Sequence, residues 1–280
     1  MSQRPPAPAV HPDPPTGDPP GRRRDPWEHL RALTAARIAL GRAGSSLPTA
    51  PLLAFQQAQA LARDAVHTRF DTVGLCKGLD ALGIDWTEVA SAAGDRQQYL
   101  QRPDRGRELG PGQAQRLRAL APTVPPDVVL IVADGLCAQA AMRHGLPMLE
   151  RLVPGLRRLD IRLAPVVIAR QARVALGDRI GEALGARLAV ILLGERPGLS
   201  SPDSLGAYLT WQPHPQRHDA QRNCVSNIRP PEGLSHDAAA HTLLYLVTQS
   251  LRRQLSGILL KDDSAGVPSL LASRADSSPD

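Results

Sequence analysis

Three short runs of aliphatic residues, the first two followed by helical patterns, limit the folds open to this chain more than any other feature. The runs occupy residues 128–132, 165–169 and 188–193. Continuous apolar runs of this length are typical of strands buried on both faces, and strands that alternate with helices form mostly parallel sheets. The sequence therefore predicts an α/β fold, with a mostly parallel sheet and helices on both of its faces.

The pattern continues beyond the third run. Residues 207–211 indicate a fourth strand, and residues 258–260 indicate a short final strand. Between them, Ser235 suits the N-cap of a long helix with an apolar stripe, and Gly257 suits the end of that helix. We therefore expect the sheet to extend to about residue 260.

The first 120 residues carry helical patterns instead. Asp25 can cap a first helix, and Thr49 can cap a second helix that places Leu52 and Phe55 on one face. Further helical segments are expected between residues 70 and 100. This part of the chain is therefore predicted to be mostly helical.

Composition changes along the chain predict four regions. Residues 1–25 are rich in Pro, Arg, Asp and Gly and are expected to be a disordered tail. Residues 26–122 form the helical N-terminal region, and residues 123–263 form a Rossmann-like domain. Residues 264–280 are expected to be a flexible C-terminal tail.

The positive charge does not indicate nucleic acid as a partner. The formal charge is +6, but the arginines are spread among acidic residues, and the densest run, 22–24, lies in the proline-rich tail. Aromatic residues, which would stack on bases, make up only 3% of the chain. We therefore expect no nucleic-acid partner.

Membrane, secreted and zinc-binding classes are also disfavoured. No run approaches the roughly 18 apolar residues that a membrane span requires, and the N-terminus lacks the order of a secretory signal. Cys76, Cys137 and Cys224 are an odd number without a C-x-x-C pair, and the histidines lack metal-ligand spacing. These features predict a protein of the reducing cytoplasm, with neither a membrane association nor a metal site.

Four loops are candidate ligand-binding segments. Ligands of open α/β sheets bind beyond the carboxyl ends of the strands. The predicted strands assign this position to residues 134–137, 170–174, 194–204 and 212–227. No nucleotide-binding glycine motif or nucleophile elbow occurs in the chain. The residues alone therefore predict a ligand-binding α/β domain of open specificity.

Single residues in these loops allow more than one interpretation. Glu195 is either a ligand contact or a partner of Arg196, and Cys224 is either a polar contact or a small buried side chain. Asp134, followed by glycine, is either an acid or part of a strand-to-helix turn. The residue types leave these alternatives open.

Eight ordered segments resemble the small chain of ethanolamine ammonia-lyase. Two of them are the run GERPGL at 194–199 and the run RNCVSNIRP at 222–230. The other six lie at 36–44, 46–49, 55–56, 62–67, 133–136 and 172–178. The resemblance extends over about residues 27–262 with the segments in the family's order, which makes the set far more specific than any one run.

The resemblance implies a cofactor site in this chain. In that family, residues at the positions of Val174, Glu195 and Cys224 contact cobalamin, so the Rossmann-like domain would contact adenosylcobalamin. The Asp-x-His-x-x-Gly motif, which supplies a histidine to cobalt, is absent. The implied cofactor is therefore base-on, with no cobalt ligand from this chain.

The resemblance also implies a division of labour within a hetero-oligomer. A large subunit would hold ethanolamine, which is converted to acetaldehyde and ammonia by adenosylcobalamin radical chemistry. This chain would help to bind the cofactor and would contribute no catalytic acid, base or nucleophile. Related chains of bacterial microcompartments begin with an amphipathic targeting helix, which the prolines of residues 1–24 do not permit.

Two other functions remain compatible with the residues. One is a stand-alone α/β enzyme, with Cys137 or Cys224 as nucleophile and His241 as base. The other is a scaffold subunit that packs on a partner without contacting the cofactor. Activity of the isolated chain would favour the enzyme, and an unchanged cobalamin affinity without this subunit would favour the scaffold.

Overall fold

The computed structural model describes residues 22–23, 25–34 and 36–267. The tails predicted for residues 1–25 and 264–280 lie outside these residues, except for 22–23, 25 and 264–267. The chain divides into two compact units, residues 1–58 and 59–280. Each unit is described separately below.

The first unit contains short elements and the start of a long helix. Strand β1 (Arg22–Arg23) pairs antiparallel with β2 (Arg42–Ala43), although β1 lies in a segment predicted to be disordered. The first predicted helix is a 3₁₀ helix, η1 (Glu28–Leu33), preceded by Asp25, whose carboxylate accepts a hydrogen bond from the Trp27 N–H. Helix α1 (Thr49–His67) begins where the sequence predicted it.

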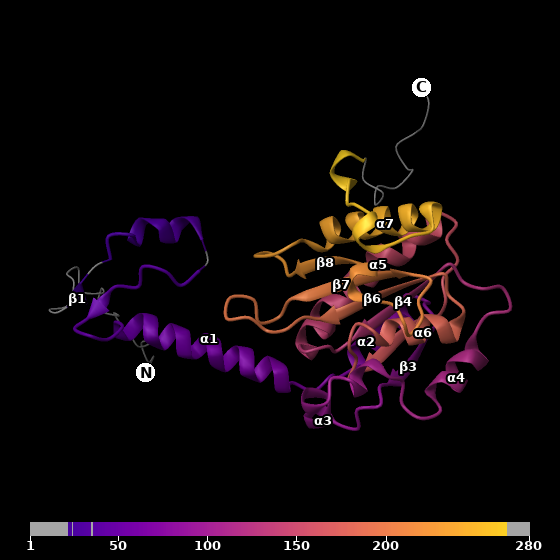
Figure 1. The fold of residues 1–280 in the computed structure, drawn as a ribbon, viewed down its shortest axis with the longest axis horizontal. Coiled ribbons are helices and arrows are strands. Elements are labelled where there is room, and N and C mark those ends of the chain that lie inside the picture. The colour runs from indigo at the N-terminus through magenta and orange to yellow at the C-terminus, as the bar shows by residue number, and fades with distance from the viewer. Residues whose placement is uncertain (1–21, 24, 35, 268–280) are drawn as a thin grey trace, which may run out of the picture. The chain divides into compact units, whose positions relative to one another are not determined.

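The second unit is built on one six-stranded sheet with the order β3-β5-β4-β6-β7-β8. Its strands are β3 (Trp86–Ala90), β4 (Val128–Ala133), β5 (Val166–Arg170), β6 (Leu188–Gly194), β7 (Leu205–Trp211) and β8 (Arg222–Ile228). The first four strands in this order are parallel, and β7 and β8 extend the sheet antiparallel (Figure 1). The predicted α/β fold with a mostly parallel sheet is confirmed.

Helices cover both faces of this sheet, as predicted. Side chains of β4 alternate between two cores, with Leu130 in one and Ile131 in the other. Helices α2 (Val73–Ala81), α5 (Ala138–Arg158) and α7 (His236–Arg253) pack on the Leu130 face, and α4 (Gln113–Leu120) and α6 (Leu176–Leu184) on the Ile131 face. Helix α7 lies along α5 in Figure 1.

The remaining elements of this unit are short. They are α3 (Arg96–Gln101) and the 3₁₀ helices η2 (Arg105–Arg107), η3 (Asp219–Gln221), η4 (Gly257–Leu259) and η5 (Ser264–Gly266). Within the described part of the chain, no helix has both the length and the apolar character needed to cross a bilayer.

Both edge strands were absent from the sequence prediction. Strand β3 falls in a region predicted to be helical, and β8 falls in the predicted loop 212–227. Polar residues interrupt both edge strands, as Thr87 and Glu88 do in β3, so these strands lack the continuous apolar run that identified the central strands. The predicted strand 258–260 is wrong as well, because most of it lies in η4.

The end of α7 also differs from the prediction. Ser235 caps the start of the helix, since its hydroxyl accepts the Ala238 N–H. The helix ends at Arg253, however, and Gln254 adopts the left-handed conformation that was expected of Gly257. Gly257 has φ +82° and begins η4 instead.

The carboxyl ends of β4 and β6 lie unusually close together. At Gly135, φ is +54°, and a Cβ atom there would lie 2.1 Å from the carbonyl oxygen of Gly194. A Cβ atom on Gly194 would in turn lie 2.0 Å from the carbonyl oxygen of Cys137. Only glycine permits both approaches. Helices α5 and α6, which follow β4 and β5, cover opposite faces, so the sheet has a topological switch point here.

Candidate functional site

A crevice of about 440 Å³ opens at the carboxyl ends of β5 and β6. Its lining includes the apolar side chains Leu136, Val174 and Leu193 and the polar groups of Glu195, Tyr208 and Ser226. This combination of apolar surface with a few polar groups is typical of small-molecule sites. The topology of an open α/β sheet places ligands at this edge.

The loop that carries Val174 is held by a buried carboxylate. Asp134 is 2% exposed, and its two oxygens accept the backbone N–H groups of Gln171 at 3.0 Å and Ala172 at 3.1 Å. The Arg96 guanidinium lies 3.6 Å from the same carboxylate. Because these partners surround the carboxylate, Asp134 ties the end of β4 to the loop after β5. It therefore belongs to a turn, and no free acid stands at this position.

A second anchor of this loop comes from α3. The Tyr99 hydroxyl donates to the carbonyl oxygen of Ala172 at 2.9 Å, and the Arg173 guanidinium lies 4.3 Å above the Tyr99 ring. Burial holds the pKa of Tyr99 above its usual range, so the hydroxyl remains a neutral donor. Tyr99 and Asp134 together fix the position of the half-buried Val174.

Glu195 immediately follows β6 and points its carboxylate into the crevice. The hydroxyls of Ser204 and Ser226 each donate to it at 2.5 Å, and the Asn227 N–H approaches at 3.4 Å. Space for the side chain exists because residue 206 is glycine, where a Cβ atom would lie 2.6 Å from a Glu195 oxygen. The alternative pairing with Arg196 is not observed among the described ion pairs. The carboxylate therefore has hydroxyl and N–H donors but no ion-pair partner in the part of the chain that the structure describes.

Cys224 lies on strand β8, opposite Tyr208 of β7. It is exposed, which excludes the interpretation as a buried apolar group, and it stands on a strand where a loop was predicted. Desolvation against the sheet and the charge of Glu195 raise the pKa of its thiol, although a hydrogen bond from Tyr208 acts in the opposite sense. Cys224 is thus a neutral thiol beside the crevice, connected to it through Tyr208.

The arrangement gives no support to a cysteine nucleophile. Cys137 is buried at the N-cap of α5, where its sulfur contacts the Pro202 carbonyl oxygen at 3.3 Å, and burial raises its pKa. His241 lies on α7, and its Nε2 is 3.1 Å from the carbonyl oxygen of Ser264. No hydrogen bond among the described residues joins a histidine to either candidate cysteine. A cysteine needs such a base to be activated.

Sequence reasoning selected Val174 and Glu195, which the structure brings into one crevice, but it missed Tyr208 and Ser204. Tyr208 belongs to a predicted strand, and it faces away from the core on which its neighbours Ala207 and Leu209 pack. The alternation of a strand predicts that difference. Ser204 carried no recognisable signal, since its role depends on the pairing of β6 with β7.

Comparison with known proteins identifies close relatives of the whole chain. The family model described as ethanolamine ammonia-lyase light chain (EutC) matches residues 24–261. The chain is 54% identical to the ethanolamine ammonia-lyase small subunit of Ralstonia nicotianae, covering 90% of this chain and 93% of that protein. It is 55% identical to the small subunits of Azotobacter vinelandii and Pseudomonas aeruginosa, covering 86% of this chain and 89% and 88% of those proteins.

Proposed function

Because the chain belongs to the ethanolamine ammonia-lyase light chain family, we propose that it is the small subunit of a carbon–nitrogen lyase that converts ethanolamine to acetaldehyde and ammonia. In this proposal a large subunit holds ethanolamine, and the crevice of this chain contacts adenosylcobalamin. The observation that carries the cofactor role is the carboxylate of Glu195, which is held by two serine hydroxyls and forms no ion pair among the described residues, in a crevice that also offers apolar side chains.

The residues of the crevice fit a cobalamin. A corrin has apolar ring surfaces and a rim of amide groups, so it requires apolar contacts and hydrogen-bond acceptors. Val174 and Tyr208 supply the former, and Glu195 supplies the latter. Cys224 adds a neutral thiol next to Tyr208. Among the described residues that line the crevice there is no histidine, so the lining would hold the corrin through apolar contacts and hydrogen bonds.

Within such a complex this chain binds and orients, and it performs no proton transfer. Bound adenosylcobalamin would supply an organic radical by homolysis of its cobalt–carbon bond. Glu195 would accept hydrogen bonds from the cofactor, and Val174 would exclude water from one side of it. The crevice is smaller than a cobalamin, so a second chain must cover the rest, as the small-subunit name of the relatives implies.

The cofactor contact is tested by Glu195→Ala in the complex with the large subunit. Loss of the acceptor leaves amide donors unpaired at a desolvated interface, which typically costs about 1–3 kcal/mol, or roughly five- to 150-fold in cobalamin affinity. Glu195→Gln keeps one acceptor oxygen and should lose less. Glu182→Ala, on the exposed face of α6, is the matched control. Unchanged cobalamin affinity in Glu195→Ala would leave a scaffold role as the better interpretation.

The division of labour is tested by assaying the purified chain alone. We expect no ammonia from ethanolamine until a large subunit is added, because the crevice leaves most of a cobalamin open to water. Ammonia release by the isolated chain, above a control without adenosylcobalamin, would contradict this proposal and favour a stand-alone enzyme.

A cytoplasmic location of the complex completes the proposal. Cys76, Cys137 and Cys224 are free thiols, as expected in a reducing compartment. Fluorescence microscopy of the tagged full chain in a shell-forming host would test this location.

A further inference from the structure

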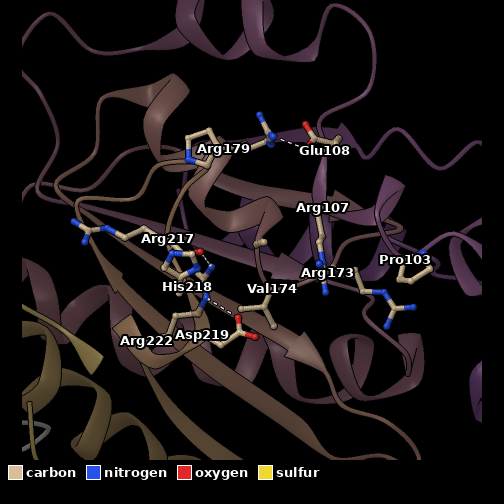
Figure 2. Close-up of a pocket in the computed structure, with 12 residues that line it drawn as sticks. Pro103, Arg107, Glu108, Arg173, Val174, Arg179, Arg217, His218, Asp219 and Arg222 are labelled. Carbon is tan, nitrogen blue, oxygen red and sulfur yellow. Dashed lines mark hydrogen bonds and ion pairs between the residues drawn. The ribbon is translucent and has the colours of Figure 1, made fainter. Parts of the chain in front are cut away.

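A second cleft, of about 380 Å³, adjoins the crevice and shares Arg173 and Val174 with it. Its lining is dominated by five arginines, at positions 107, 173, 179, 217 and 222, against only two carboxylates, Glu108 and Asp219. Figure 2 shows Arg107 on one side of Val174, with His218 and Arg222 on the other. Nothing in the proposed cobalamin contacts requires so strong a positive charge at this place.

Part of this charge is neutralised by the fold. Arg179 forms an ion pair with Glu108. Arg222 is buried and pairs with Asp178 at 2.6 Å and with Asp219 at 3.3 Å. The lining and the buried Asp178 together thus carry five positive charges and three negative charges.

Three of the five arginines have no carboxylate partner within the described ranges. Among the described residues, Arg107, Arg173 and Arg217 form no ion pair. Arg217 donates from its Nε to the carbonyl oxygen of Gln212 at 3.0 Å. The side chain of the exposed Arg107 forms no hydrogen bond within the described part of the chain. Arginines left without carboxylates in a concave site are suited to an anion.

The turn that carries Arg107 is packed against Arg173. The N–H of Arg173 donates to the carbonyl oxygen of Gly106 at 2.8 Å, and a Cβ atom at Gly106 would lie 2.8 Å from the Arg173 side chain. Arg173 uses one Nη to donate to the carbonyl oxygen of Tyr99 at 3.3 Å, while its buried Nε has no partner. Packing therefore holds the two guanidinium-bearing segments together at the cleft.

We propose that this cleft binds a phosphate group, with Arg107 as its principal contact and Arg173 beside it. A guanidinium offers paired N–H donors that match the oxygens of a phosphate, and a concave surface strengthens the attraction. Two sources present this chemistry. One is the phosphodiester in the nucleotide loop of cobalamin, which rests on the proposed function, and the other is free phosphate.

The experiment uses the full chain in complex with a large subunit and compares Arg107→Ala with Arg105→Ala. Arg105 lies in the same 3₁₀ turn, is exposed and does not line the cleft, so it is the matched control. Both side chains are exposed, and neither change removes an observed ion pair. Equilibrium titrations then measure the affinities for cobalamin, for cobinamide, which lacks the nucleotide and its phosphate, and for inorganic phosphate.

Each source predicts its own result. If the phosphodiester occupies the cleft, Arg107→Ala weakens cobalamin binding about tenfold and leaves cobinamide binding unchanged. If free phosphate occupies it, Arg107→Ala weakens inorganic phosphate about tenfold and leaves cobalamin unchanged. Arg107→Lys keeps the positive charge but lacks the paired N–H donors of a guanidinium, so it should recover part of either loss of affinity. Added chloride should weaken the affected interaction further.

Equal affinities of Arg107→Ala and Arg105→Ala for all three ligands would overturn the inference. The outcome is separable from that of the proposed function. If Glu195→Ala still lowers cobalamin affinity in that case, the crevice stands and only the phosphate site fails. If the complex binds neither corrin compound, the phosphate titration still decides the inference.

Discussion

Two carboxylates flank the central strands of the sheet, and their surroundings differ. Asp127 immediately precedes β4, where its oxygens accept from Arg162 at 2.9 and 3.0 Å and from Arg187 at 3.0 Å. Glu195 immediately follows β6, where two serine hydroxyls and a backbone N–H are its only donors within the described ranges. The first carboxylate has two arginine partners, and the second has none among those residues.

This difference assigns a stabilising role to one end of the sheet and a binding role to the other. The arginines around Asp127 join the start of β4 to the segments before β5 and β6, so that carboxylate stabilises the fold. At the opposite end, the hydroxyls orient Glu195 without neutralising it. A carboxylate that is oriented but not neutralised is available to donors of a ligand. The comparison teaches that the partners of an acid, more than its burial, indicate whether it serves stability or binding.

The largest expected effect is on stability, in Asp127→Ala. Loss of the carboxylate leaves two guanidinium groups and the Arg162 N–H without their acceptor, so we expect the free energy of unfolding to fall by about 2–3 kcal/mol. Chemical denaturation of the purified chain measures this change. Asp85→Ala, at an exposed position just before β3, serves as control. A loss below that of Glu195→Ala would reverse the comparison.

Acid should weaken the Asp127 end of the sheet in a defined range. The hydrogen bonds from Arg162 and Arg187 hold the pKa of Asp127 at about 2, below its usual value. A depressed folded pKa means that the stabilisation is complete above about pH 4 and is lost as pH falls toward 2. Because both arginines are half-exposed, we expect about 1–2 kcal/mol. Unfolding free energies of wild type and Asp127→Asn should converge over this range, and parallel curves would contradict the assignment.

The smallest effect concerns the thiol beside Glu195. The uncompensated charge of Glu195 helps to raise the pKa of Cys224, so Glu195→Gln should increase the thiolate fraction. We expect alkylation of Cys224 by iodoacetamide at pH 8 to become about two- to threefold faster, because loss of the nearby charge lowers the pKa of the thiol and the thiolate is the reacting form. Peptide mass spectrometry compares Cys224 with Cys76 as an internal reference. An unchanged ratio would mean that water screens Glu195 from the thiol.

The sequence predicted the parts of the fold that packing dictates. Continuous apolar runs identified the central strands because both of their faces are buried. Polar residues interrupt β3 and β8 and leave no apolar run, so Cys224 was assigned to a loop. The position of Glu195 at the end of a strand was predicted correctly. The sequence did not predict its hydrogen bonds from Ser204 and Ser226, which replace a pairing with Arg196. Such pairings arise from the register of distant strands, which local pattern does not contain.

The close approach of Gly135 and Gly194 bears on how quickly a loaded complex forms. Because the backbones after β4 and β6 touch, neither loop can open without the other, and the walls of the crevice are set before any ligand arrives. When a ligand binds to walls that are already formed, little binding free energy is lost to the ordering of loops. Ligand association with this chain should then proceed at the rate at which ligand and crevice meet.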